Sequence, residues 1–558
     1  MSNARRLIAV ALVCTLLGQS CGVAVGAAVA ISDPDPSRAV SATGRTSAAS
    51  TTAESGSNAA SPQILATYPN PLTAGDTGEF VAVRVGGVSN LTLSDGEQSF
   101  SIPPRSGVVV LSSDPNTTRS LTPSPVVSAA LSLSNAGERL VLRRNGTTVH
   151  EIRYEDAPAG ERWNASTGRW IPLGLDLREP VATGPADATA FVLPDASTIT
   201  VETLRSADER LFLAGYTLSS ARVTDALVAA HHRGVRVRVL VEGGPVGGVS
   251  RRQAETLDRL VRAGVPVAVV AGPGAKFSFH HAKYAVVDDR ALVLTENWKP
   301  AGTGGRDSRG WGVRVESMRT AEELATVFEQ DSTGRGTVSW KSYRRGRAFV
   351  TDPPPNATYP TTIPPESVHA TNVRVLTTPG NAGKAVVRRL DEAENQIAVV
   401  NPRLDPDGRF FAALVRAARR GVTVRILLSN AWYDADENER VVTRTQALRD
   451  SGVPIEARIA EPRGQFGKVH AKGAVVDGES VLVGSLNWND HAATENREVV
   501  LELDGPEPAS YYQRAFDSDW QSASGGDDSG TMWVLVAGAL ASASLAGLIL
   551  KKTVRFER

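Results

Sequence analysis

The sequence predicts an α/β protein made of two similar halves, preceded by a β-sandwich and followed by one membrane-spanning helix. The main evidence is an internal repeat, in which residues 226–240 match residues 413–427 at an offset of about 188 residues. In each copy a helical pattern is followed by a glycine and a β-branched run, which is typical of an α/β sheet. The length of 558 residues also exceeds that of an ordinary single domain.

The start of the chain has the pattern of a secretory signal peptide, which we assign to residues 1–30. Arg5 and Arg6 precede a short apolar run, and Ala28-Val29-Ala30 offers the small residues of a cleavage site. An uncleaved membrane anchor is the alternative interpretation. Residues 31–61 are rich in Ser, Ala and Thr and contain too little apolar surface to fold, so we expect a disordered stalk there.

Residues 62–157 are expected to form the β-sandwich. Short runs of alternating apolar and polar residues are separated by turn residues, and Asn145-Gly146 between two such runs is a strong hairpin signal. The segment resembles the lamin-tail domain in residues 78–81, 90–95 and 133–138. This resemblance implies an immunoglobulin-like binding or adaptor module without a catalytic group, and the partner of this module is unknown.

The two copies of the repeat are assigned to residues 185–349 and 371–522, separated by a Pro-rich linker at 350–370. A second linker at 523–530 leads to residues 531–550, which carry no charge and are long enough to span a bilayer core of about 30 Å. The basic tail at 551–558 favours a cytoplasmic C-terminus and an extracellular body, hence a single-pass protein of the cell membrane. A buried soluble helix is the alternative interpretation of 531–550.

Composition narrows the range of partners. Lys+Arg and Asp+Glu are equal at 60 each, so no overall field attracts the chain to nucleic acid or to an anionic surface. The only two cysteines, Cys14 and Cys21, lie in the predicted signal peptide, so we expect no disulfide in the mature protein. No cluster of Cys and His suggests a metal site, and we expect neither a metal nor another cofactor.

Each half contains the motif His-x-Lys-x4-Asp at the same relative position. The two sets consist of His281, Lys283 and Asp288 in the first half, and of His470, Lys472 and Asp477 in the second. Because side chains alternate along a strand, the His and Lys of each set lie on the same face. An imidazole can attack or protonate a phosphodiester, while an ammonium neutralises a non-bridging oxygen. The repeated motif therefore indicates phosphodiester chemistry.

With these motifs, residues 185–522 resemble the phospholipase D superfamily, whose defining motif is HxKx4D. The resemblance implies two phospholipase D-like α/β halves whose histidines share one active site. It implies that one histidine attacks phosphorus to form a phosphohistidine and that the other protonates the leaving group. On this basis we expect His281 to be the nucleophile and His470 the acid. As members of the motif, Asp288 and Asp477 are assigned to the catalytic residues with His281, Lys283, His470 and Lys472, although we expect them to brace the fold rather than to touch the substrate.

The second half continues as the family does. Ser485 and Asn487 follow its motif, and the resemblance implies that both bind phosphate. It also implies that Glu498 hydrogen-bonds a catalytic imidazole and fixes its tautomer. The first half departs from this pattern, since Thr295 stands in for the serine, while Asn297 is retained.

The first half also lacks an evident counterpart of Glu498. The matching position falls near Gly312, and Glu316 is out of register. We therefore expect one histidine to lack its orienting carboxylate.

The expected function is that of a membrane-anchored extracellular phosphodiesterase acting on a phospholipid, by hydrolysis or by transfer. One alternative is an exported nuclease acting on DNA or RNA, for which the basic pairs 344–345 and 388–389 would contact phosphates. The other is a degenerate, non-catalytic surface protein that uses the fold only for binding.

Overall fold

The computed structural model describes residues 61–175, 177–272, 274–352 and 354–523. The predicted signal peptide, most of the predicted stalk, the predicted span at 531–550 and the basic tail lie outside these residues. Among the residues that are described, no helix is both long and apolar enough to cross a membrane.

The N-terminal part forms two β-sheets around a shared core. The first sheet has the order β10-β9-β1-β2-β5-β6 and the second the order β4-β3-β7-β8. One apolar cluster takes Val83 from the first sheet and Leu93 and Leu142 from the second. The strands are β1 (Gln63–Tyr68), β2 (Phe80–Arg84), β3 (Leu91–Ser94), β4 (Ser99–Ile102), β5 (Val108–Ser112), β6 (Val126–Ser128), β7 (Gly137–Arg144), β8 (Thr147–Glu155), β9 (Glu161–Asn164) and β10 (Arg169–Pro172), with short helices η1 (Ala74–Asp76) and α1 (Pro115–Thr118).

Strands β9 and β10 extend the first sheet beyond residue 157, the predicted end of this module, because β9 pairs with β1. The immunoglobulin-like topology and the lamin-tail class of the module stay predictions.

The rest of the described chain is built on one sixteen-stranded sheet in which the second half repeats the first in mirrored order. The order is β18-β14-β13-β12-β15-β16-β17-β11-β19-β26-β25-β24-β20-β21-β22, with β23 paired to β17. The mixed α/β fold predicted from the repeat is confirmed. The strands of the first half are β11 (Val181–Leu193), β12 (Arg210–Gly215), β13 (Arg236–Glu242), β14 (Val267–Val270), β15 (Tyr284–Val287), β16 (Arg290–Leu294), β17 (Ser308–Glu316) and β18 (Thr337–Ser339).

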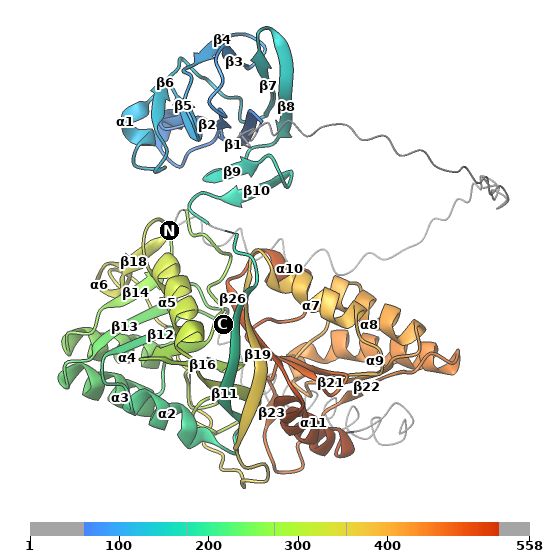
Figure 1. Cartoon of the computed structure of the whole chain (residues 1–558). Helices are drawn as coiled ribbons and strands as arrows, with labels where there is room; N and C mark the ends of the chain where they lie inside the picture. Colours follow the sequence, from blue (N-terminus) through green and yellow to red (C-terminus); the bar gives the residue numbers. More distant parts are fainter. Residues whose placement is uncertain (1–60, 176, 273, 353, 524–558) are drawn as a thin grey trace, which may run out of the picture. The chain divides into compact units, whose positions relative to one another are not determined.

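The second half begins with β19, which pairs antiparallel with β11 at the centre of the sheet (Figure 1). Because β19 starts at Glu366, the last residues of the segment predicted as a linker belong to this strand. Its strands are β19 (Glu366–Thr378), β20 (Gln396–Asn401), β21 (Thr423–Leu428), β22 (Ile455–Ile459), β23 (Lys468–Val469), β24 (Gly473–Val476), β25 (Ser480–Gly484) and β26 (Glu498–Asp504).

Helices cover both faces of this sheet. Apolar residues of α2, α3 and α4 pack on the first half, and those of α7, α8 and α9 on the second. Helices α5 and α11 contribute Phe328 and Phe516 to a central core that both halves share. The helices are α2 (Ser197–Arg205), α3 (Ala221–His232), α4 (Arg251–Arg262), α5 (Met318–Ser332), α6 (Trp340–Tyr343), α7 (Ala382–Asp391), α8 (Arg409–Arg419), η2 (Trp432–Asp434), α9 (Ala435–Asp450), α10 (Asp490–Thr494) and α11 (Pro506–Gln521).

Two buried arginines connect the halves reciprocally. Arg497, just before β26, forms an ion pair of 2.8 Å with Asp331 of α5 in the other half. Arg309 of β17 forms one of 3.0 Å with Asp519 of α11, again in the other half. Arg309 also contacts Asp195 at 2.5 Å. A buried charge needs such a partner, so these pairs bind each half to the other.

Candidate active site

Each motif histidine is held by the backbone of the opposite half. His281 lies just before β15, and its backbone N–H donates to the carbonyl of Arg497 at 2.9 Å. His470 lies just before β24, and its backbone N–H donates to the carbonyl of Arg309 at 2.9 Å. The arginines that connect the two halves therefore also position the two histidine segments.

The imidazole of His281 is oriented by a carboxylate of the second half. Its Nδ1 lies 2.9 and 3.0 Å from the two carboxylate oxygens of Glu498, the first residue of β26. An ionised carboxylate only accepts hydrogen bonds, so Nδ1 carries the proton and Nε2 keeps its lone pair. Burial opposes ionisation of Glu498, but nearby His281 and Lys283 outweigh it and lower the pKa of this carboxyl.

The imidazole of His470 also has a carboxylate partner, so the expectation that one histidine lacks this partner was wrong. Its Nδ1 lies 3.2 Å from Oε2 of Glu296, a buried residue of the first half. Burial again opposes ionisation, while His470 and Lys472 lower the pKa of Glu296. Each histidine is thus paired with a glutamate from the opposite half.

The counterpart of Glu498 is Gly310, not Gly312 as the spacing predicted. Leu294 pairs with Gly312 across β16 and β17, just as Gly484 pairs with Val500 across β25 and β26. Two residues before Val500 is Glu498, and two residues before Gly312 is Gly310.

Glu296 occupies the space that a side chain on Gly310 would fill. A Cβ atom built on Gly310 would lie 2.2 Å from Cγ of Glu296. At the corresponding point the second half has Leu486, between Ser485 and Asn487. The two halves therefore supply the same carboxylate from different positions. The signal that could have revealed Glu296 is its acidic side chain within a segment after β16 whose neighbouring residues are buried.

The two motif lysines lie in the same buried cluster. Lys283 donates to the carbonyl of His281, and Lys472 donates to the carbonyl of His470 at 2.6 Å. Lys472 also reaches the carbonyl of Thr295 in the other half at 3.5 Å. Burial lowers the pKa of Lys283, and it lowers that of Lys472 to about 8. Both lysines interact electrostatically with Glu296 and with Glu498, so the two motifs form one charged centre.

Burial keeps both imidazoles neutral in the free protein. It lowers the pKa of His281 to about 4 and that of His470 to about 3, against the opposing effect of the two carboxylates. Nearby lysines lower both values further. A neutral imidazole with a free Nε2 lone pair is the form that can attack phosphorus.

The predicted phosphate-binding residues lie beside this centre in two different environments. Asn297 is buried, and its Oδ1 has no hydrogen-bond partner within the described part of the chain. Asn487 occupies the same position in the second half and is half-buried. The hydroxyl of Thr295 accepts the backbone N–H of Trp311 at 2.9 Å, and that of Ser485 accepts the backbone N–H of Val499 at 3.0 Å. The two hydroxyls therefore brace β17 and β26.

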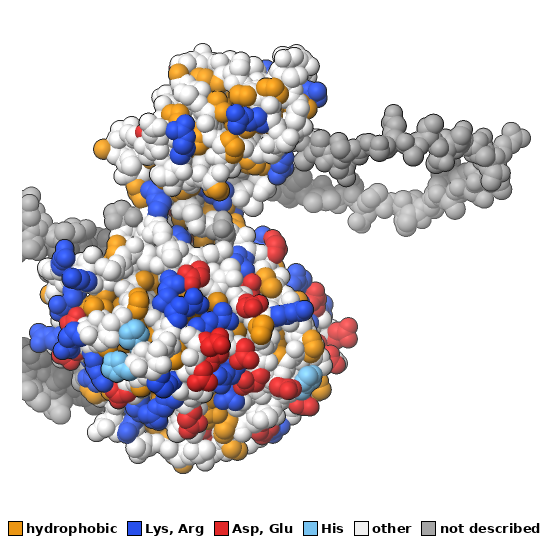
Figure 2. All heavy atoms as spheres, turned by 60° about the vertical axis from the view of Figure 1, so that its left-hand side comes forward, with side chains coloured by type: hydrophobic (Ala, Val, Ile, Leu, Met, Phe, Trp, Pro, Cys, Tyr) orange, Lys and Arg blue, Asp and Glu red, His pale blue; other side chains and the backbone are white. Residues whose placement is uncertain are grey.

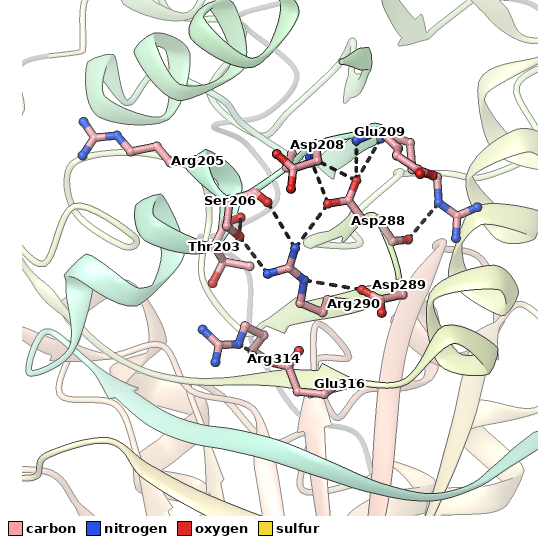
Figure 3. A network of polar contacts seen from close by, with 12 residues as sticks. Thr203, Arg205, Ser206, Asp208, Glu209, Asp288, Asp289, Arg290, Arg314 and Glu316 are labelled. Carbon is pink, nitrogen blue, oxygen red and sulfur yellow. Dashed lines mark hydrogen bonds and ion pairs between the residues drawn. The ribbon is translucent and has the colours of Figure 1, made fainter. Parts of the chain in front are cut away.

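The motif aspartates lie in tight turns outside the histidine cluster, which corrects their inclusion among the catalytic residues. Asp288 and Asp477 have φ values of 54° and 55°. As Figure 3 shows for the first half, the Asp288 carboxylate accepts hydrogen bonds from the backbone N–H groups of Asp208 and Glu209. It also accepts one from the backbone N–H of Arg210, the first residue of β12. Asp477 accepts the equivalent bonds at the start of β20, from Glu394, Asn395 and Gln396. Both aspartates hold turns of the fold.

Two imidazoles, each with its own carboxylate and lysine in one buried centre, define a phosphodiesterase type of site. The model of the family "Cardiolipin synthase, PLD-like domain" matches residues 200–332 and 386–520, one stretch in each half. The chain belongs to the phospholipase D superfamily.

Individual relatives match only part of this chain. The mitochondrial cardiolipin hydrolase of Xenopus tropicalis is 36% identical over 102 residues, which are 18% of this chain and 44% of that protein. Cardiolipin synthase A of Erwinia tasmaniensis is 25% identical over 292 residues, 50% of this chain and 57% of that protein. The chain thus spans about half the length of these relatives. The crystal structure of phosphatidylserine synthase from Haemophilus influenzae superposes with a TM-score of 0.46 at 13% identity, over 63% of this chain and 88% of that one.

Proposed function

We propose that this chain is a membrane-anchored extracellular phosphodiesterase that cleaves or transfers the phosphodiester of a phospholipid through a phosphohistidine. The observation that carries the proposal is the pair of His–Glu contacts, His281 with Glu498 and His470 with Glu296, in one buried centre. Each contact joins the two halves, so the arrangement forms only when both halves fold together.

In the proposed first step, Nε2 of His281 attacks phosphorus. The new P–N bond forms while the bond from phosphorus to the leaving oxygen breaks, and His470 donates its proton to that oxygen. Both imidazoles are neutral in the free protein, so the acid must gain its proton as substrate binds. The negative phosphodiester favours the protonated form of an adjacent imidazole. Lys283 and Lys472 neutralise the non-bridging oxygens.

In the second step, His470 takes a proton from water or from an alcohol. The oxygen of this acceptor attacks phosphorus, the P–N bond breaks and neutral His281 is regenerated. Water gives hydrolysis, and an alcohol gives transfer to a new headgroup. Asn297 and Asn487 complete the proposed phosphate site with their side-chain amides, while Thr295 and Ser485 support this site from behind, since their hydroxyls accept backbone N–H groups of β17 and β26.

A phospholipid substrate is favoured by three considerations. Two matched relatives are named for cardiolipin, one as its hydrolase and one as its synthase. The predicted span at 531–550 would hold the enzyme beside its substrate. Basic and acidic side chains are interspersed on the face shown in Figure 2, and Lys+Arg and Asp+Glu are equal at 60 each, so no overall field favours a nucleic acid.

Membrane attachment and export rest on the sequence patterns at the two ends, and the N-terminal two-sheet module is proposed as an immunoglobulin-like adaptor. A protease added to intact cells should remove the body and leave a tag on the C-terminus intact. A tag digested from outside would contradict the proposed orientation.

The substrate is tested with the full chain in neutral detergent micelles and EDTA. Cardiolipin or phosphatidylglycerol should lose or exchange its headgroup, while plasmid DNA stays supercoiled. His281→Asn and His470→Asn serve as controls, and acid quenching should trap a labelled phosphohistidine in the wild type. Nicking of DNA without phospholipid turnover would support the nuclease instead. Inactivity on both substrates, without a trapped intermediate, would support the binding protein.

A further inference from the structure

Two strongly exposed apolar side chains stand at corresponding places in the two halves. Trp432 is 85% exposed and Val246 is 81% exposed. Val246 lies in the loop after β13, and Trp432 in η2 after β21, and these two strands have the same place in the mirrored sheet order. Because burying large apolar side chains is favourable, two such side chains left exposed to water indicate a surface that binds a partner.

Val246 is linked to the first histidine. Its backbone N–H donates to the hydroxyl of Tyr216 at 2.6 Å. The Tyr216 ring packs edge-on against the imidazole of His281, with 4.8 Å between the ring centroids. Only one aromatic ring therefore separates the exposed loop from this imidazole.

Trp432 is linked to the second histidine in a similar way. Its neighbour Tyr433 accepts a hydrogen bond from Lys468 at 3.0 Å, and Lys468 lies two residues before His470. The next residue, Asp434, is buried and interacts electrostatically with the motif lysine Lys472. The segment 432–434 thus runs from the surface to the charged centre.

Both links lead to the same edge of the sheet. Tyr284 of β15 pairs with Ala214 near the end of β12, and Gly473 of β24 pairs with Val400 near the end of β20. The histidine segments before β15 and β24 therefore lie at the carboxyl edge of the parallel strands, where the loops after β13 and β21 also begin. Val246 and Trp432 flank the site from opposite halves.

We infer that Trp432 and Val246 form an interfacial rim that inserts into the surface of a phospholipid aggregate and presents a lipid headgroup to the two histidines. This inference rests on the proposed function and deepens it. A Trp side chain favours the boundary between headgroups and acyl chains. Lys468 adds a positive charge beside Tyr433, although it shares this charge with Asp307 at 3.6 Å. A nucleic acid would stack its bases on aromatic rings, and Val246 has no aromatic ring to offer.

The control is Met318, which is also exposed but lies at the opposite edge of the sheet. It follows the end of β17, where Glu316 pairs with Arg290 across the sheet, next to the turn that contains Asp288. Met318→Ala removes a comparable apolar side chain without touching the rim.

The first measurement uses the full chain in neutral detergent micelles with increasing phosphatidylglycerol, and a short-chain phosphatidylglycerol below its micelle concentration. Trp432→Ala and Val246→Ala should each lower the ratio of the micellar to the monomeric rate by about tenfold, and Met318→Ala should leave it unchanged. Equal ratios of the micellar to the monomeric rate in all three variants would contradict the inferred role of Trp432 and Val246.

A second measurement does not depend on turnover, so it separates failure of the rim from failure of the proposed function. In a His281→Asn background, brominated phosphatidylglycerol should quench less of the tryptophan emission once Trp432 is replaced by Ala. Met318→Ala should be quenched like its parent. Unchanged quenching in Trp432→Ala would overturn the inference. If this variant keeps the quenching but loses binding to single-stranded DNA, the rim is assigned to nucleic acid instead.

Discussion

The two halves of the large sheet place a glutamate beside each motif histidine, but they do so from different positions. In the second half the carboxylate is Glu498, on the first residue of β26. In the first half the same place on β17 holds Gly310, and Glu296 from the preceding segment fills the space above it. The fold therefore constrains where the carboxylate lies in space rather than which residue of the repeat provides it.

The largest effect should come from removing either histidine. His281→Asn and His470→Asn should each lower kcat by about 10³-fold or more, since nucleophile and acid act as one unit. Steady-state rates on phosphatidylglycerol micelles measure this. A variant that keeps more than about a tenth of the wild-type rate would mean that the halves do not share one site.

Removing either carboxylate should cost about 10²-fold or more in kcat, because the imidazole loses its fixed tautomer. Glu296→Gln and Glu498→Gln should therefore give similar losses. Unequal losses, with Glu296→Gln close to the wild type, would show that Glu296 only fills space.

The exchange of positions can itself be tested by moving the carboxylate. Glu296→Ala combined with Gly310→Glu should recover part of the activity that Glu296→Ala loses, because residue 310 corresponds to residue 498. Gly310→Glu alone should destabilise the protein, since its Cβ would lie 2.2 Å from Glu296. No recovery in the double variant, at a melting temperature near that of the wild type, would contradict the equivalence of the two positions.

These positions explain what the sequence could and could not predict. The repeat and the HxKx4D spacing predicted the mixed α/β fold and the two histidine sets, because both are local patterns within one half. Glu296 could not be found by counting from the motif, since the count led to Gly312 and the functional carboxylate lies on a different segment. The motif alone also could not separate Asp288, which caps backbone N–H groups, from the residues of the charged centre.

The connection between the halves was likewise beyond the reach of sequence patterns. Arg497 and Asp331 are 166 residues apart in the chain, and no local periodicity relates them. Their ion pair becomes evident only once β26 and α5 are placed in space.

The two connecting ion pairs differ in a way that predicts unequal stability. Arg497 has Asp331 as its carboxylate partner, while Arg309 contacts both Asp195 and Asp519. Asp331→Asn leaves a buried guanidinium without a carboxylate and should cost about 3–5 kcal/mol of unfolding free energy. Asp519→Asn leaves Asp195 in place, so its cost should be nearer to about 1 kcal/mol. Chemical denaturation compares the two, and equal costs would contradict the asymmetry.

Acid sensitivity is the smallest expected effect, and it should be nearly equal in the two halves. Burial lowers the pKa of His281 to about 4 and that of His470 to about 3, from 6.5. Between these values and 6.5 the unfolded chain binds more protons than the folded one, so stability falls as the pH drops below 6.5. At pH 5.5 each histidine should cost about 1 kcal/mol relative to pH 7.5. Denaturation of His281→Asn and His470→Asn at both pH values should show a smaller acid loss than the wild type, and an unchanged loss would mean that the imidazoles are not buried in neutral form.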